Sequence, residues 1–459
     1  MFVFGVPLAS QSPVAPANRM KSRLETSADT RRPDNGIYIR MLPHVLIRKK
    51  ELGPYAEIID PARVEHIVNL AKALQGMRVL EINSTSSGGG VAELLSSVVP
   101  LMNALGIATD WQLVQKSRRF FEITKRFHNA LQGMDTEIST ADMDTYLDHN
   151  RQFAEALEGD YDFIIINDPQ PAAMRHFAGD RGAKWIWRCH IDTSKPSPAV
   201  WSFLQPYIQD YDAAVFTLPS FVPPRLKLKR VEFIPPAIDP LSPKNWPLPP
   251  GLCDQVMIGF GIDNSRPLMT QVARFDPWKD PAGVIAVYRT VKKKLPGLQL
   301  GLIGSMAGDD PEGWRIYNKI AKEAVKDDDL FMFTNLDGVG HLEVNAFQRS
   351  SEVIVQKSLR EGFGLAVSEA LWKNIAVVGG NTGGIPLQMV NGVGGFLVDS
   401  TEECADRVLY LLNHQDEARE MAARGHDRVR EHFLITRYLA ESLSLLRSMA
   451  EARAGHRAA

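Results

Sequence analysis

The feature that most constrains the fold is an alternation of short apolar runs with longer segments of helical pattern. Residues 163–166 (Phe-Ile-Ile-Ile) are typical of a strand in a parallel sheet that helices cover on both faces. Similar runs recur at residues 77–83, 111–114, 185–189, 213–216, 231–234, 268–272, 298–303, 330–333, 353–356 and 376–378. Because parallel strands are joined by crossover helices, the alternation predicts an α/β protein with doubly wound, Rossmann-like sheets.

A proline cluster divides this series into two. Seven prolines fall within residues 235–251, which is typical of a stiff link between domains. We predict one Rossmann-like domain at residues 36–240, a second at 241–430, and a helical segment at 431–459 that packs back toward the first domain. Residues 1–35, rich in Ser, Pro, Ala and Arg, are predicted to be a disordered leader. The cleft between the two domains is the expected ligand site.

The composition excludes several classes of protein. The 459 residues carry a formal net charge of −2, which gives no electrostatic case for binding nucleic acid. Cys189, Cys253 and Cys404 are few and widely spaced, which favours neither a disulfide framework nor a zinc site and fits a reducing cytoplasm. No apolar run approaches the roughly 20 residues that span a bilayer, so no membrane association is expected.

The stretch from Glu361 to Glu369 lies between an apolar run and a helical segment and contains Gly362 and Gly364. A strand, a glycine-containing turn and a helix leave free backbone N–H groups that can bind an anion. Two carboxylates in such a turn argue against bare phosphate as the only ligand. They favour a ligand with both phosphate oxygens and hydroxyl groups, such as a nucleoside diphosphate sugar.

Two other groups of residues complete a predicted phosphate site. The chain contains neither GxxxxGK[ST] nor GxGxxG after its first strand, but it has the triple Gly88-Gly89-Gly90 at that position. Arg274 and Lys279 follow the first predicted strand of the second domain. A diphosphate leaving group needs fixed positive charge, and these two cations would supply it without a metal.

Polar residues also end two neighbouring strands of the first domain. Asp168 follows one of them, and His190 follows the next, flanked by Arg188 and Asp192. The carboxyl ends of parallel strands are where such sheets bind ligands, so acceptor binding or proton handling is predicted here. The clustered tryptophans are expected in the core: Trp185, Trp187 and Trp201.

The order of these residues resembles a known family. Arg274 and Lys279, followed by Glu361 and Glu369 as an E-x7-E motif, resemble the retaining glycosyltransferases of the GT-B fold, family 4. Longer phrases are similar to the trehalose glycosyltransferring synthases, at residues 83–85, 88–93, 168–171, 187–192, 274–279, 309–314, 344–349 and 360–365. The likeness runs from about residue 40 to about residue 445.

The resemblance implies transfer of glucose from UDP- or ADP-glucose to free glucose, giving α,α-trehalose with retention. It implies that the N-terminal domain binds the acceptor and the C-terminal domain the nucleotide sugar. The implied donor-binding residues are Gly89, Gly90, Arg274, Lys279, Glu361, Phe363, Gly364, Leu365 and Glu369. The implied acceptor-binding residues are Asp168, His190 and Arg188, and the implied catalytic residues are Glu361, His190, Arg274 and Lys279. Arg274 and Lys279 would hold the diphosphate, Glu361 the donor sugar and Glu369 the ribose.

One residue departs from the family pattern, and several alternatives stay open. The family usually has His before Asp-Pro-Gln, whereas this chain has Asn167, which can form hydrogen bonds but cannot transfer a proton in that role. A retaining trehalose phosphorylase, a family 4 glucosyltransferase with another acceptor and a non-catalytic sugar-nucleotide sensor remain alternatives. We expect no tightly bound cofactor and no metal site. Three properties stay open from the sequence: the preferred nucleotide base of the donor, stimulation of activity by Mg²⁺, and assembly into a homodimer.

Overall fold

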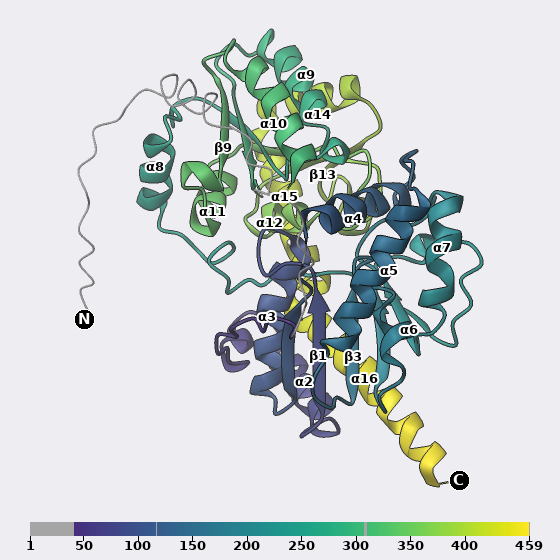
Figure 1. Ribbon diagram of the computed structural model, residues 1–459. Helices are drawn as coiled ribbons and strands as arrows, with labels where there is room; N and C mark the ends of the chain where they lie inside the picture. Colours follow the sequence, from purple (N-terminus) through teal and green to yellow (C-terminus); the bar gives the residue numbers. More distant parts are fainter. Residues whose placement is uncertain (1–40, 116, 307–309, 459) are drawn as a thin grey trace.

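The computed structural model describes residues 41–115, 117–306 and 310–458. The predicted leader at residues 1–35 lies outside this range. The described chain forms two α/β lobes, with the C-terminal lobe above the N-terminal lobe in Figure 1. Each lobe is built on one parallel sheet, which confirms the predicted fold class.

The N-terminal sheet has six strands in the order β2-β1-β3-β4-β5-β6. Every pairing within it is parallel. The strands are β1 (Arg78–Asn83), β2 (Ala108–Leu113), β3 (Phe163–Asn167), β4 (Lys184–Arg188), β5 (Ala213–Phe216) and β6 (Val231–Phe233). The order reverses at β1, so the carboxyl ends of β1 and β3 flank the crevice where doubly wound sheets bind ligands.

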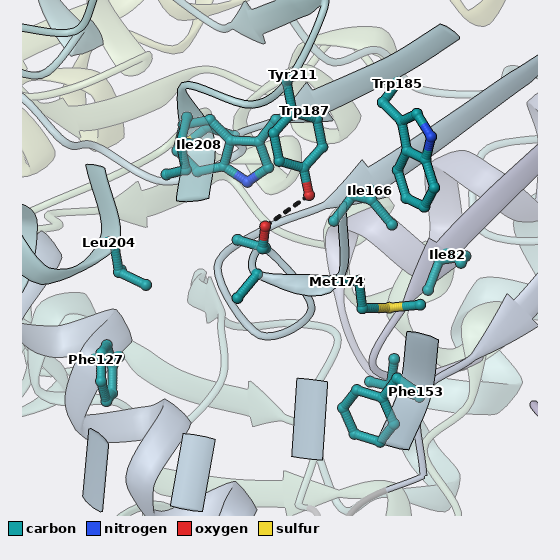
Figure 2. Packing of buried hydrophobic residues seen from close by; sticks show 14 of the residues in the cluster. Ile82, Phe127, Phe153, Ile166, Met174, Trp185, Trp187, Leu204, Ile208 and Tyr211 are labelled. Carbon is teal, nitrogen blue, oxygen red and sulfur yellow. Dashed lines mark hydrogen bonds between the residues drawn. The ribbon is translucent and has the colours of Figure 1, made fainter. Parts of the chain in front are cut away.

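Helices cover both faces of this sheet and bury its apolar side chains. They are α2 (Pro61–Lys72), α3 (Gly90–Ala104), α4 (Arg118–Leu131), α5 (Thr140–Glu155), α6 (Met174–Ala178) and α7 (Pro198–Ile208), with short turns η1 (Gly53–Glu57) and η2 (Pro219–Phe221). Figure 2 shows part of the core, where the Tyr211 hydroxyl donates to the Ala172 carbonyl at 2.7 Å. Trp185, Trp187 and Trp201 are buried there, as predicted.

The C-terminal sheet has seven strands in the order β12-β13-β11-β10-β7-β8-β9. They are β7 (Leu268–Val272), β8 (Gln299–Gly304), β9 (Leu330–Thr334), β10 (Val353–Gln356), β11 (Val377–Gly380), β12 (Val390–Asn391) and β13 (Gly394–Val398). No apolar run of the sequence predicted β12, which has two residues, or β13, which begins with two glycines. The order reverses between β7 and β10, so the loops after these two strands meet at the second crevice.

The helices around this sheet include the one that follows the Glu361 turn. They are α8 (Pro250–Gly259), α9 (Pro281–Lys292), α10 (Pro311–Ala324), α11 (His341–Arg349), α12 (Leu365–Trp372), α13 (Ile385–Gln388), α14 (Thr401–Asn413) and α15 (Gln415–His432), with turns η3 (Pro277–Lys279) and η4 (Asn335–Asp337). Helix α12 lies on the side of the C-terminal lobe that faces the N-terminal lobe (Figure 1).

Two segments connect the lobes. The last helix, α16 (Ile435–Ala458), returns to the N-terminal lobe and packs against α2 and α3, with Tyr438, Leu439 and Leu443 in that lobe's core. The proline-rich link is held in place at Asp239, whose carboxylate accepts from Tyr55 at 2.9 Å and from the Ser97 hydroxyl at 2.7 Å. These contacts fix the beginning of the link to the N-terminal lobe.

In the part of the chain that the structure describes, no helix is long and apolar enough to cross a bilayer. No group of three or more His, Cys, Asp or Glu side chains in the same ranges is arranged to hold a metal ion.

Candidate active site

The two lobes meet where loops at the carboxyl ends of their strands face each other. A Cβ atom added to Gly362 would lie only 2.1 Å from the His190 carbonyl oxygen, so the Glu361 turn touches the loop after β4 at a position that only glycine fits. A Cβ atom on Gly90 would lie 3.0 Å from a methyl group of Leu365. The glycine triple and the Glu361 turn, far apart in sequence, are therefore neighbours across the cleft.

The Glu361 turn is shaped by Gly364 and anchored by Phe363. Gly364 has a φ of +86°, a left-handed conformation that favours glycine, and it is the N-cap of α12. Phe363 is buried, with its ring 5.5 Å from that of Phe433. The turn therefore places the first backbone N–H groups of α12, starting at Leu365, beside the N-terminal lobe.

Lys279 and Glu361 form an ion pair at the cleft. Lys279 Nζ lies 2.5 Å from Glu361 Oε2, which also accepts from the Ser358 hydroxyl at 2.9 Å. The Arg274 side chain remains 45% exposed, with Nη2 3.4 Å from the carboxylate of Asp276. The structure thus brings together the two predicted cations and the first glutamate, and leaves one cation open to solvent.

Asp276 organises this loop. Its carboxylate accepts from the Trp278 backbone N–H at 2.9 Å and so begins η3. Burial acts to raise the pKa of Asp276, but Lys125, Arg274 and Lys279 together hold it well below its ordinary value. A permanently charged carboxylate at this point keeps the two cleft cations in a defined arrangement.

Glu369 lies deeper, 1% exposed, and its ion pair spans the two lobes. Lys244 of the link lies 2.9 Å from Glu369 Oε1 and 3.0 Å from Glu93 of α3. Gln348 Nε2 is 3.4 Å from the other oxygen of Glu369. Burial acts to raise the pKa of Glu369, but Lys244 and Lys373 more than offset this, so the pKa lies below its ordinary value.

Asp168 and His190 lie together at the ends of β3 and β4. The His190 backbone N–H donates to Asp168 Oδ1 at 2.9 Å, and His190 Nε2 lies 2.8 Å from Asn167 Oδ1. Asp168 has a φ of +65°, unusual for a residue other than glycine. Burial raises the pKa of Asp168 to about 6, partly offset by the hydrogen bond from His190 and by Arg188 and Arg274. Arg274 of the C-terminal lobe is thus close enough to act on the charge of Asp168.

Arg188 does not join this group, which corrects the prediction that it binds the acceptor. Its side chain is buried, with residue exposure of 2%, and it donates to the Ile234 carbonyl. Its guanidinium carbon lies 5.4 Å from the centre of the Tyr438 ring on α16. Since α16 covers Arg188, this cation acts on Asp168 and His190 only through its charge.

Helix α4 adds cleft residues that the sequence analysis missed. Lys125 Nζ lies 3.2 Å from Asp276, and Asn129 accepts from the Trp278 indole N–H at 3.2 Å. His128 lies on the same side, where burial and then Lys125 and Arg274 lower its pKa to about 3. The available signal was the amphipathic pattern of residues 118–131, in which a basic face opposes a strongly apolar one.

The arrangement combines three elements that suit transfer of a sugar from a diphosphate. Arg274 and Lys279 can stabilise negative charge on a leaving group. The backbone N–H groups of α12 can bind an anion. The carboxylate of Glu361 and the side chains of His190 and Asp168 can bind hydroxyl groups.

Two family models match the two lobes. The model of the N-terminal domain of trehalose synthase matches residues 81–223, and the model of glycosyl transferases group 1 matches residues 256–428. The second match spans Arg274, Lys279, Glu361 and Glu369.

Individual proteins match most of the chain. The trehalose synthase of Rubrobacter xylanophilus is 48% identical over 410 residues, which cover 88% of this chain and 98% of that protein. The trehalose synthase of Pyrococcus horikoshii is 44% identical over 403 residues, 87% of this chain and 97% of that protein. Among solved structures, a trehalose-6-phosphate synthase superposes with a TM-score of 0.66 at 17% identity, covering 81% of this chain and 99% of that one, which supports the GT-B fold alone.

Proposed function

This chain belongs to the trehalose synthase family of GT-B glycosyltransferases, and from that premise we propose that it transfers glucose from a nucleoside diphosphate glucose to free glucose. The product would be α,α-trehalose, formed with retention at the donor carbon. UDP-glucose and ADP-glucose are the candidate donors. No tightly bound cofactor or metal takes part in the proposed reaction.

The observation that supports this proposal most strongly is the pair Lys279–Glu361 beside the exposed Arg274. One carboxylate and two cations of the same lobe lie together at the cleft, with the N-terminus of α12 adjoining them. The cations suit the diphosphate, whose charge grows as the glycosidic bond breaks. Glu361 suits the hydroxyl groups of the transferred glucose. Glu369, which the resemblance assigns to the ribose, is buried with its two carboxylate oxygens engaged by Lys244 and Gln348, so we propose no substrate contact for it.

The proposed mechanism keeps both reacting groups on one face of the donor sugar. The bond from C1 to the diphosphate oxygen breaks, and a bond from C1 to the acceptor hydroxyl oxygen forms on the same face. The acceptor proton passes to the departing phosphate oxygen, so no covalent enzyme intermediate is needed. Contact between the lobes at Gly362 and His190 would exclude water from the reacting centre.

Incubating the full-length protein with UDP-glucose or ADP-glucose and free glucose tests this proposal. We expect release of the nucleoside diphosphate together with a disaccharide whose NMR spectrum is that of α,α-trehalose. Incubation of trehalose with inorganic phosphate tests the phosphorylase alternative. Binding of the nucleotide sugar without turnover would favour a sensor, and a different glucoside from a panel of acceptors would favour another family 4 transferase.

Arg274→Ala is the matched variant for this experiment. The side chain is 45% exposed, and among the residues that the structure describes its only ion pair is to Asp276 at 3.4 Å, so the substitution should leave the melting temperature almost unchanged. Turnover should fall by about 10²–10³-fold, since a group that stabilises the leaving charge is lost. A variant that retains full turnover would contradict the proposed role of the cleft cations.

A further inference from the structure

Three polar side chains form a hydrogen-bonded row across β1, β3 and the loop after β4. Asn167 Nδ2 donates to Glu81 Oε2 at 2.7 Å, and Asn167 Oδ1 lies 2.8 Å from His190 Nε2. Glu81 and Asn167 are buried, whereas His190 is partly exposed beside the Glu361 turn. The row therefore connects the interior of the sheet to the cleft.

A backbone carbonyl fixes the orientation of the Asn167 amide. Asn167 Nδ2 lies 3.2 Å from the Ile82 carbonyl oxygen, which can only accept a hydrogen bond. The NH₂ group must therefore face Ile82 and Glu81, and the amide oxygen must face His190. Because that oxygen is also only an acceptor, His190 Nε2 has to carry the hydrogen.

The remaining ring nitrogen of His190 is then a free acceptor. Burial holds the pKa of His190 well below its ordinary value, and Arg188 adds to this, so the ring is neutral. A neutral ring with hydrogen on Nε2 has a lone pair on Nδ1. Within the described parts of the chain, no hydrogen bond to this nitrogen is present. The other titratable groups around the row are Asp168, Glu81, Tyr438 and, from the opposite lobe, Arg274.

We propose that Asn167 and Glu81 are positioning residues that lock His190 in the Nε2–H tautomer, so that Nδ1 accepts a hydrogen bond from a sugar hydroxyl in the cleft. The sugar ligand rests on the proposed function, whereas the tautomer follows from the geometry alone. In this tautomer His190 has no proton to give at Nδ1. It orients a hydroxyl group and leaves the acceptor proton to the departing phosphate oxygen.

NMR of the full-length protein with ¹⁵N-labelled histidine tests the tautomer without any assay of activity. The ring signals of His190 are assigned by their absence in His190→Gln. We expect an unprotonated Nδ1 and a protonated Nε2 at neutral and mildly acidic pH. His426 is an internal control of the opposite kind, because its Nδ1 lies 2.8 Å from the Trp372 carbonyl oxygen and must carry the hydrogen. A protonated Nδ1 or a charged ring at neutral pH would overturn the proposal.

Two substitutions of Asn167 test its positioning role. Asn167→Leu removes the acceptor, so the His190 signals should shift to a mixture of tautomers and kcat/KM should fall about 3- to 10-fold. Asn167→Asp keeps the acceptor but adds a negative charge, so the Nε2–H tautomer should remain and an acidic limb should appear in the pH dependence of kcat/KM. Unchanged His190 signals in Asn167→Leu would refute the role of Asn167.

The experiments distinguish failure of the proposed function from failure of the tautomer proposal. If the His190 signals behave as expected but the wild-type protein forms no trehalose, the tautomer stands and the substrate assignment is wrong. If trehalose forms but the ring carries hydrogen on Nδ1, the proposed function stands and the positioning role is wrong.

Discussion

The two glutamates of the Glu361–Glu369 stretch each pair with a lysine, but the surroundings of the two pairs differ. Lys279 and Glu361 come from two loops of one lobe and lie at the cleft beside the exposed Arg274. Glu369 is buried in α12, and its partner Lys244 comes from the link between the lobes and also binds Glu93 of the other lobe. One pair can meet a substrate, whereas the other connects three parts of the chain.

The difference shows that a motif with two identical residue types can serve two physical purposes. The first pair borders the cleft, where the Lys279 side chain is 17% exposed, so it can respond to a developing charge there. A buried ion pair costs desolvation and depends on both partners being present. The first pair should therefore control turnover, and the second should control stability and the relative position of the lobes.

The largest expected effect is that of Lys244→Met. The substitution leaves the buried Glu369 without its closest cation, so the free energy of unfolding should fall by about 3–5 kcal/mol. Chemical denaturation followed by circular dichroism measures this change. Lys326→Met is the matched control, because Lys326 is exposed and its pair with Glu323 lies at the surface. Equal stabilities of the two variants would show that Lys244 does not connect the lobes.

A smaller effect, and one of a different kind, is expected for Lys279→Met. Turnover should fall by about 10²–10³-fold, because a cation that we propose to face the leaving group is lost. The free energy of unfolding should change much less than in Lys244→Met, since Glu361 keeps its hydrogen bond from Ser358. If Lys279→Met has a lower free energy of unfolding than Lys244→Met, the proposed difference between the two pairs is wrong.

The smallest effect is a change with pH in the free energy of unfolding, caused by Lys373, which lies near the second pair. Burial lowers the pKa of Lys373 to about 7, although Glu369 acts to raise it. Between that pH and the ordinary value of 10.5, the unfolded chain binds a proton that the folded chain does not, so the free energy of unfolding should rise with pH in this window. The slope should reach at most about 1.4 kcal/mol per pH unit for one group.

Lys373→Met should abolish this rise. Urea denaturation of the wild type and the variant at pH 7, 8 and 9 measures the difference between their slopes. Parallel slopes would show that Lys373 keeps its proton on folding. Lys279→Met leaves Lys373 and its partners in place, so this variant should keep the wild-type slope.

Local patterns predicted the strands and the Glu361 turn well. Apolar runs such as residues 163–166 and 353–356 are strands because a sheet covered on both faces admits few polar side chains. The turn could be recognised because Gly362 and Gly364 are needed there for close contact and for a positive φ. Strand burial and backbone conformation depend on a few neighbouring residues, so the residue types at those positions are enough to predict them.

Contacts between distant segments were harder to predict. Arg188 was placed at the acceptor because it precedes His190, but α16, some 250 residues further along the chain, covers it. Helix α4 was overlooked although its residues Lys125 and Asn129 bind the loop that carries Arg274 and Lys279. Neither contact follows from local pattern, because each depends on how two lobes and a returning helix pack together.

The sequence by itself therefore determined two parallel sheets, a glycine-containing turn with two carboxylates, and the cations of the neighbouring loop. Periodicity and backbone conformation are local properties that residue types encode directly. Only the tertiary structure decided which partner each glutamate has, that Lys244 joins the two lobes, and that Asn167 orients the ring of His190. Electrostatic and hydrogen-bond partners are set by distance in space, and chain order does not give that distance.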